Sequence, residues 1–384
     1  MKILLVGEYS RLHNSLKKGL EELEHEVTLV GTGDMFKKFP VDESIRAKWF
    51  SDKPLPLLIR KIYLRFFKKD PAQWEIGYRF KKLLPKLQNY DVVQLINSHS
   101  IGTYPNTEII LLKRLFEQNG KVFLMACGDD YPVVKAYLEG KMRYHMLTPY
   151  LESGSTLNSD FALKYLTKPF KKLFDFGYQN AEAIIPSDMD YKIPWEGWDK
   201  VSEMIPNPII ISKDYSPIKI DGKKIRILFG INTMNYTKKG YRFFDEALSK
   251  IEKKYAHLLE ITRTENLPFS KYVKELETCH ILLDNVYAFD QGYNALEAMA
   301  RGKVVFTGAE IEFEQHYNLT EKVAINALPD SESVFLELEK LILNPEKIES
   351  IGRNARRFIE KEHDYIIVAK KYLSVWENFS KGSL

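Results

Sequence analysis

The chain has 384 residues, which is more than one ordinary hydrophobic core holds, so we expect two domains. Hydrophobic residues make up 45% and charged residues 28% of the sequence, as is typical of a soluble globular protein. The net charge of +4 is small for this length and does not call for a nucleic-acid partner. The two cysteines, Cys127 and Cys279, lie far apart beside apolar runs, so we expect reduced thiols and no disulfide framework.

The beginning of the chain, MKILLVGEYS, does not predict a signal peptide, because its apolar run is short and a glutamate follows at once. No apolar run elsewhere reaches the roughly 18 residues that a membrane-spanning helix needs. We therefore expect a cytoplasmic protein.

Short runs rich in Val, Ile and Leu alternate with longer amphipathic segments along most of the chain. Nearly continuous apolar strands of this kind predict parallel sheets that are covered by helices on both faces. The expected strands are residues 2–7, 26–31, 91–97, 121–128, 183–187, 226–232, 258–263, 281–284, 303–308 and 323–327.

A stretch with several prolines and lysines and no helical period separates the two sets of strands. We interpret it as the connection between two doubly wound α/β domains, so that the expected domains are 1–205 and 222–364 with a linker at 206–221. The last segment, about 365–379, is amphipathic and predicts a helix. In open α/β sheets, ligands bind at the carboxyl ends of the strands, so the loops that follow the strands are where we expect the chemistry.

The first such loop, GEYSRLHNSL, contains one glycine where a dinucleotide fold would need three, so NAD chemistry is not expected. Gly7 offers backbone amides and Ser10 a hydroxyl to a ligand. The alternative is that Ser10 only caps the following helix.

Two lysines, Lys238 and Lys239, precede an expected helix, after a strand and a polar loop that contains Asn232. The helix dipole disfavours cations at this end, so the pair makes sense if an anion such as a diphosphate joins them. An ordinary solvated charge pair is the alternative.

A third loop, DQGYNALE, precedes another expected helix. Gly292 would let the backbone approach a ligand closely, and Asp290, Gln291 and Asn294 would offer a carboxylate and amides to hydroxyl groups. Asn294 and Glu297 also have the spacing of a capping box, which is the simpler explanation of their positions.

In combination, NALEAMARGKVVFTGAE, TKKG before a helix and IPNPI before the linker resemble the retaining glycosyltransferases of family four. The resemblance extends over essentially the whole chain, and LEAMARGKVV is its most specific part. It implies a GT-B fold, in which two Rossmann-like α/β domains face each other across a cleft. The segment KEHDYIIVAKKYLSVWE resembles the closing helix of that family, so residues 365–384 are expected to cross back to the first domain.

The resemblance implies a nucleotide-diphosphate sugar of the UDP or GDP type as co-substrate, bound mainly by the second domain, with no further cofactor. Glu297 matches the glutamate that holds the ribose hydroxyls, and Lys239 matches the lysine that neutralises the diphosphate. The segment 262–272 matches the border of the base. The expected donor-binding residues are Gly7, Ser10, Asn232, Lys238, Leu267, Gln291, Gly292, Tyr293 and Asn294.

The sequence departs from the family pattern at two positions. Phe289 stands where the family usually has another glutamate, and Asp290 could supply that carboxylate if the loop shifts by one residue. Met234 stands where the family has an arginine, so phosphate binding would depend on Lys238 and Lys239 together. These departures affect the choice of donor sugar more than the class of reaction.

In such an enzyme the acceptor hydroxyl attacks the face of the sugar that the nucleotide diphosphate leaves. The two lysines and the helix start at Asn294 would stabilise the departing charge without a metal. The expected catalytic residues are Lys239, Asp290, Glu297 and His99. The loops HSIG and CGDDY follow strands of the first domain, so Asn97, Asp129 and Asp130 are expected at the acceptor; a structural role is the alternative for a lone histidine such as His99.

Residues 55–74 interleave basic side chains with Leu, Ile, Tyr and Phe. A basic amphipathic helix of this kind can lie on an anionic membrane, here the inner face of the plasma membrane, and would suit a lipid-linked acceptor. The alternative is an ordinary surface helix whose lysines face water.

The expected function is a retaining, metal-independent glycosyltransferase of the hexosyltransferase type, which transfers sugar to a glycan or glycolipid hydroxyl in surface polysaccharide or glycoconjugate biosynthesis. Two other classes stay open. One is a nucleotide-sugar epimerase or a phosphorylase on the same scaffold, and the other is an inactive protein that binds sugar nucleotides.

Overall fold

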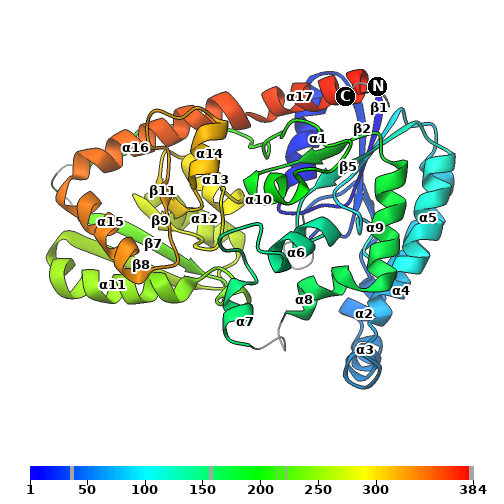
Figure 1. The fold of residues 1–384 in the computed structure, drawn as a ribbon, viewed down its shortest axis with the longest axis horizontal. Helices are drawn as coiled ribbons and strands as arrows, with labels where there is room; N and C mark the ends of the chain where they lie inside the picture. Colours follow the sequence, from blue (N-terminus) through cyan, green and yellow to red (C-terminus); the bar gives the residue numbers. More distant parts are fainter. Residues whose placement is uncertain (35–38, 155–158, 213, 221, 223, 380–384) are drawn as a thin grey trace.

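The computed structural model describes residues 1–34, 39–154, 159–212, 214–220, 222 and 224–379. Its strands form two separate sheets, one in each half of the chain. Figure 1 shows the two halves side by side, with the last two helices, α16 (Pro345–Phe358) and α17 (Tyr365–Asn378), leading from the second half across to the first.

The first sheet has six parallel strands in the order β3-β2-β1-β4-β5-β6. The strands are β1 (Lys2–Val6), β2 (Glu26–Gly31), β3 (Glu43–Ser44), β4 (Val92–Leu95), β5 (Lys121–Ala126) and β6 (Ile184–Pro186). Ile3 and Leu5 belong to the hydrophobic cluster on one face, and Leu4 and Val6 to the cluster on the other. Because both faces are covered, the longer strands are mainly apolar, which is the pattern that predicted them.

The helices of the first half are α1 (Leu12–Glu22), α2 (Lys48–Asp52), α3 (Pro54–Phe67), α4 (Pro71–Leu83), α5 (Pro105–Glu117), α6 (Tyr131–Leu138), α7 (Thr148–Glu152), α8 (Asp160–Leu163), α9 (Lys168–Asn180) and α10 (Met189–Lys192). Helix α1 packs on one face of the sheet, while α5 and α9 pack on the other. Proline stands in the first turn of α3, α4 and α5, where its missing N–H leaves no hydrogen bond unmade.

The second sheet has five parallel strands in the order β11-β10-β9-β7-β8. They are β7 (Ile225–Ile231), β8 (Leu259–Glu265), β9 (Ile281–Leu283), β10 (Val304–Thr307) and β11 (Ile325–Asn326). The helices are α11 (Tyr241–Tyr255), α12 (Phe269–Thr278), α13 (Tyr293–Met299), α14 (Ile311–His316), α15 (Ser331–Leu343) and α16 (Pro345–Phe358). All ten expected strands are therefore present in the two sheets, and only the short β3 was not predicted.

The last helix, α17 (Tyr365–Asn378), packs against α1 of the first half, as predicted. The packing is close, because a Cβ placed on Gly19 of α1 would lie 2.3 Å from the Tyr365 carbonyl oxygen. At the far end, the Trp376 indole Nε1 donates a 3.0 Å hydrogen bond to Gln94 Oε1 of β4. The chain thus returns to the first sheet after completing the second.

The two halves also touch directly. One cluster of buried apolar side chains continues from the first half into the second. At its edge, Arg143 of the first half lies 2.7 Å from Glu310 and 2.7 Å from Glu312 of the second. The loops that follow the strands of the two sheets are therefore held near each other.

Candidate functional site

Lys239 and Asn294, which come from two different loops of the second half, share one buried carboxylate. Lys239 Nζ lies 2.9 Å from Asp284 Oδ1, and Asn294 Nδ2 donates to the same oxygen at 2.8 Å. Asp284 follows β9 directly and is 2% exposed. The sequence analysis missed Asp284; the available signal was an acidic residue placed directly after an apolar strand.

The charge of Lys239 is stabilised by this contact. Burial by itself lowers the pKa of Lys239, but the attraction of Asp284 and the contact with Tyr241 outweigh it, so that the pKa is raised above its usual range. Gly240 begins α11 with φ of 66°, and a Cβ there would come within 2.8 Å of Val286. The turn that places Lys239 therefore requires a glycine.

Lys238 lies closer to the first half. Its ammonium group stands 4.7 Å from the ring centroid of Phe161. Burial lowers the pKa of Lys238, and the negative charge of Asp129, from the loop after β5, opposes that shift. The two adjacent lysines thus have different surroundings, and only Lys239 is paired with Asp284.

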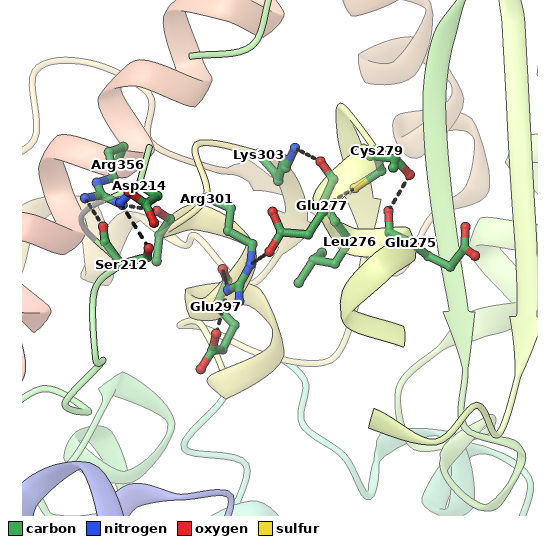
Figure 2. Close-up of polar contacts among 12 residues, drawn as sticks. Ser212, Asp214, Glu275, Leu276, Glu277, Cys279, Glu297, Arg301, Lys303 and Arg356 are labelled. Atoms are coloured by element: carbon green, nitrogen blue, oxygen red, sulfur yellow. Dashed lines mark hydrogen bonds and ion pairs between the residues drawn. The ribbon is translucent and has the colours of Figure 1, made fainter. Parts of the chain in front are cut away.

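Glu297 connects the two halves through an ion pair. Its Oε1 lies 3.2 Å from Arg11 Nη1 at the start of α1, and its Oε2 lies 2.6 Å from Arg301 Nη1 one turn further along the chain. Figure 2 shows Arg301 between Glu297 and Glu277, which it contacts through Nε at 2.9 Å. Neither arginine was among the expected residues. Sequence spacing does not relate Arg11, at the start of α1, to Glu297 of α13, whereas Arg301 stands four residues after Glu297, and that spacing was the available signal.

The capping-box explanation for Asn294 and Glu297 is wrong. Helix α13 begins at Tyr293 and has Gly292 as its N-cap, with no side chain bonded to the helix start. Asn294 lies inside the first turn and bonds to Asp284, while Glu297 turns towards Arg11. Both side chains are therefore available for a role other than capping.

Asp290 points towards α10 of the first half. Its Oδ2 accepts a 3.1 Å hydrogen bond from the Met189 amide, and its Oδ1 accepts a 2.7 Å bond from the Gln291 amide. In return, Asp190 of α10 accepts from the amides of Phe289 and Asp290, at 3.0 Å and 3.1 Å. The two carboxylates tie the loop to α10 from both sides.

These carboxylates are buried close to one another. Burial raises the pKa of Asp190, and the charge of Asp290 raises it further, while the backbone amides lower it. Burial also raises the pKa of Asp290. Asp188, one residue before α10, has a raised pKa for the same reasons: burial first, then the charges of Asp190 and Asp290.

Two other side chains of the 290–294 loop bond to backbone carbonyl groups, and Gly292 faces solvent. Gln291 is buried, and its Nε2 donates a 2.7 Å bond to the Gly308 carbonyl, so it braces the loop. The Tyr293 hydroxyl donates a 2.9 Å bond to the Pro208 carbonyl. Gly292 is exposed, and a Cβ built on it would meet nothing within 4 Å, so a ligand can approach the backbone there.

His99 and Asn97 are held inside the loop that follows β4. His99 Nδ1 lies 2.9 Å from a carboxylate oxygen of Glu108. Glu108 also accepts hydrogen bonds from the loop amides of residues 101–103. The Asn97 side chain accepts from the His99 amide at 3.0 Å and donates to the Tyr9 hydroxyl at 3.3 Å. The structure thus gives both residues contacts that brace the loop.

Asp130 and Asp129 differ although they are adjacent. Asp130 caps α6, accepting from the Tyr131 amide at 2.8 Å, and it also accepts from the amide and hydroxyl of Ser98. Asp129 has a buried carboxylate oxygen that finds no hydrogen-bond partner among the described residues. Burial raises the pKa of Asp129 to about 6, against the opposing charges of Lys238 and Lys164. Of the four first-half candidates, Asp129 is the one whose carboxylate has an unused acceptor.

The loop after β1 is shaped by Gly7. Its φ is 90°, and a Cβ there would lie 2.3 Å from a side-chain carbon of Ile96. The Ser10 amide donates a 2.8 Å bond to Asp34. The N-cap of α1 is Arg11, with no side-chain bond to the helix start, so the alternative that Ser10 caps this helix is wrong.

Asn232 follows β7, and Leu267 lies just beyond the neighbouring edge strand β8. The Asn232 side chain accepts from the Met234 amide at 3.1 Å and caps a short 3₁₀ turn, Thr233–Asn235. Leu267 follows β8 and is half-buried. Met234, which stands in place of the family arginine, is 82% exposed, so this loop presents an apolar side chain to solvent.

Within the described residues, no group of three or more His, Cys, Asp and Glu side chains could hold a metal ion. In the same part of the chain, every helix is too short or too polar to cross a membrane. Two surface hollows lie away from Lys239 and Glu297; one is lined by α1 and residues 40–42, and the other by residues 89–92, 118–121 and Trp376.

The second half of the chain matches a known family. Residues 231–374, which begin at the last residue of β7 and include Lys239, α13 and most of α17, match the sequence profile of the family described as Glycosyl transferase-like. This segment is a glycosyl transferase group 1-like domain. Lys239, Asp284, Asn294 and Glu297 all belong to this glycosyl transferase-like domain. Among curated proteins, no sequence matches the chain.

Solved structures resemble the glycosyl transferase-like domain together with the first half. Sucrose-phosphate synthase from Thermosynechococcus elongatus is 12% identical, with 98% of each chain covered and a TM-score of 0.61. Anabaena HepE, in a structure with UDP and glucose, is 11% identical, with 98% of this chain and 100% of that one covered and a TM-score of 0.57. A protein named as a UDP-N-acetylglucosamine 2-epimerase from Listeria monocytogenes is 13% identical, with 98% and 95% covered and a TM-score of 0.50. The predicted GT-B-like fold is thus confirmed, and the reaction has to be argued from the site.

Proposed function

We propose that the protein is a retaining glycosyltransferase that moves a sugar from a nucleotide-diphosphate donor to a hydroxyl group of a glycan or glycolipid. The observation that carries this proposal is the contact of Lys239 and Asn294 with the buried Asp284. It holds a positively charged ammonium group on the same carboxylate as Asn294, in the first turn of α13, and Gly292 at the start of that helix is exposed. An anion with a sugar attached fits such a place, because the charge and the open backbone lie next to each other.

In this proposal Lys239 stabilises the diphosphate as it leaves. The charge that develops on the departing phosphate oxygens is attracted to an ammonium group whose position is already fixed by Asp284, so little reorganisation is needed. Lys238 adds a second positive charge on the side of the first half. No metal ion is needed for this step.

Glu297 is proposed to accept hydrogen bonds from the ribose hydroxyls. Its carboxylate is oriented by Arg301, at 2.6 Å, and touches Arg11 of the first half at 3.2 Å. A ribose that bonds to Oε1 would take the place of Arg11. Donor binding would therefore change a contact between the two halves.

Asp290 was expected to supply the carboxylate that is missing at Phe289. Each of its two oxygens already accepts from a backbone amide, of Met189 or Gln291, and the side chain is buried, so little of the carboxylate is open to a sugar. We propose that Asp290 acts mainly through the loop backbone, by holding residues 290–294 in place for the donor.

The acceptor is proposed to approach from the first half. Asp129 is the best-placed carboxylate there, because it has an unused acceptor oxygen and lies near enough to Lys238 for their charges to interact. Asn97, His99 and Asp130 would shape the surrounding loops. In this proposal the nucleotide of the donor is UDP or GDP, and UDP is favoured by analogy with the Anabaena structure.

The test is incubation of the purified protein with a panel of UDP- and GDP-sugars in the presence of EDTA. We expect slow release of the nucleoside diphosphate, and a product with the anomeric configuration of the donor by NMR. Interconversion of the nucleotide sugars would instead indicate an epimerase, and a dependence on free phosphate a phosphorylase. Thermal stabilisation by UDP or GDP without any turnover would indicate an inactive binding protein.

A further inference from the structure

Helix α3 carries an apolar stripe that faces solvent. None of its 14 residues is buried. Leu55, Leu58, Ile59, Ile62 and Phe66 follow one another at the spacing of a single helix face, and their exposed fractions are 68%, 55%, 39%, 44% and 71%. An amphipathic helix on a globular protein normally turns this face inwards, so the orientation of α3 is the reverse of the usual one.

One side of α3 is fixed to the protein, so the stripe does not result from a loosely placed helix. Leu64 and Phe67, outside the stripe, are also exposed, at 42% and 61%. The Arg60 guanidinium forms two hydrogen bonds of 2.7 Å with the carboxylate of Asp70, the residue that caps α4. The ring of Tyr63 meets the ring of Trp74 edge-on, with centroids 5.7 Å apart. Figure 1 shows α3 projecting from the first half at its lower end, beyond α2 and α4.

Positive charge accompanies the apolar stripe. Residues 48–69 contain seven Lys and Arg and one Asp, a net charge of +6, whereas the whole chain carries +4, so the remainder of the protein carries −2. Lys61 and Arg65 flank the stripe, and Lys68 and Lys69 follow the helix; among the described residues none of these four forms an ion pair. The segment therefore exposes apolar side chains and also carries a net positive charge.

We propose that α3 docks on the surface of an anionic lipid bilayer, with the stripe inserted among the acyl chains and the basic side chains at the headgroups. Apolar side chains on one face with Lys and Arg along the border are typical of helices that lie in a membrane interface. At 14 residues, the helix is about 21 Å long, shorter than the hydrocarbon core of about 30 Å, so it would lie flat and not span.

A second copy of the chain is a poorer occupant of the stripe. A symmetric contact between two α3 helices would bring the unpaired Lys61 and Arg65 of both copies together, with Asp52 as the one acidic residue of the segment. Asp52 is already bonded to Arg46. An anionic bilayer supplies the negative charge that a second copy lacks.

This proposal concerns where the protein lies and does not depend on the reaction. If the proposed function holds as well, a docked α3 would bring the first half, from which the acceptor is expected to approach, to a lipid surface. The protein could then bind a lipid-linked acceptor while the lipid part of that acceptor stays in the bilayer.

The test is co-sedimentation of the full chain with vesicles of phosphatidylcholine alone or with one-third phosphatidylglycerol. We expect binding only to the anionic vesicles, weakened by salt. The double variant Ile62→Ser/Phe66→Ser should bind the anionic vesicles at least about tenfold more weakly, because these exposed side chains contribute to membrane insertion and not to the fold. Lys61→Gln/Arg65→Gln should weaken binding at low salt.

Two matched control variants replace exposed apolar or basic side chains at positions far from α3 in the sequence. Leu336→Ser/Leu343→Ser replaces exposed leucines of α15, and Lys347→Gln/Lys370→Gln removes two exposed charges from α16 and α17. Both should bind like the unchanged protein. All variants should release nucleoside diphosphate from the donor at the same rate in the absence of vesicles, which separates this test from that of the proposed function.

Equal binding to both vesicle types, or unchanged binding of Ile62→Ser/Phe66→Ser, would overturn the proposal. So would a wild-type dimer in sedimentation equilibrium that the same variant converts to a monomer, because the stripe would then be covered by a second copy. A blue shift of tryptophan emission on binding is a further expected result, since Trp49 and Trp74 are 61% and 47% exposed and lie beside α3.

Discussion

The loops after the strands of the two sheets contain similar polar residues but use them differently. In the second half, Lys239 and Asn294 meet at Asp284 and leave Lys239 one-quarter exposed. In the first half, Asn97 and Asp130 bond to amides and side chains of the loops after β4 and β5, and His99 lies against Glu108 of α5. The comparison indicates that a polar residue at a strand end is a candidate for ligand binding when its contacts leave it partly exposed, as those of Lys239 do.

The largest expected effect is on the second half. Lys239→Ala should lower donor turnover about 100-fold, or raise the barrier by about 3 kcal/mol, because the leaving diphosphate loses a fixed positive charge. Nucleoside diphosphate release measures this effect. Lys239→Arg keeps the charge and should retain more activity than alanine, whereas equal activity of Lys239→Ala and the unchanged protein would remove Lys239 from the mechanism.

The next largest effect is expected in the first half, where it should concern stability and not turnover. Asp130→Ala should lower the free energy of unfolding by about 2 kcal/mol, because the α6 cap and the Ser98 contacts are lost together. Chemical denaturation measures it, and donor turnover per folded molecule should not change. Asp175→Ala, which removes an exposed ion pair with Lys171, is the control and should cost about 0.5 kcal/mol or less.

The contact between α10 and the 290–294 loop should make stability depend on pH. Burial raises the pKa of Asp190 to about 7, whereas an unfolded aspartate releases its proton near about 4. Between these values the folded protein holds more protons than the unfolded chain, so the free energy of unfolding should fall as the pH rises from about 4 to about 7.

Thermal unfolding over that pH range measures the effect. Asp190→Asn keeps an oxygen that can accept from the Phe289 and Asp290 amides but does not titrate, so its pH dependence should be shallower. A variant with the same slope as the unchanged protein would show that Asp190 is not the group responsible.

The smallest expected effect concerns the link between the halves. Arg11→Ala removes a partly exposed ion pair with Glu297 and should change the free energy of unfolding by less than about 1 kcal/mol. Its effect on donor affinity is more informative: if a ribose replaces Arg11 at Glu297, the variant should bind UDP at least as tightly as the unchanged protein. Weaker binding in a titration calorimeter would mean that Arg11 supports the donor and does not compete with it.

Much of the fold could be predicted from the sequence because it depends on local patterns. Ten apolar runs became the strands of two parallel sheets, and the amphipathic segment at the end became α17. A strand covered on both faces has no polar side to show, so its sequence is unmistakably apolar. The short β3 was missed because two residues, Glu43 and Ser44, make no pattern.

What the sequence by itself determined is the chemical character of each loop: lysines before α11, a glycine and amides before α13, and basic and apolar residues in α3. Only the tertiary structure decided which of these groups meet, because contacts such as Lys239 with Asp284 and Arg11 with Glu297 join residues that no periodicity relates. It also decided that the apolar stripe of α3 faces outwards, since a helical repeat gives two faces but does not say which one the rest of the chain will cover.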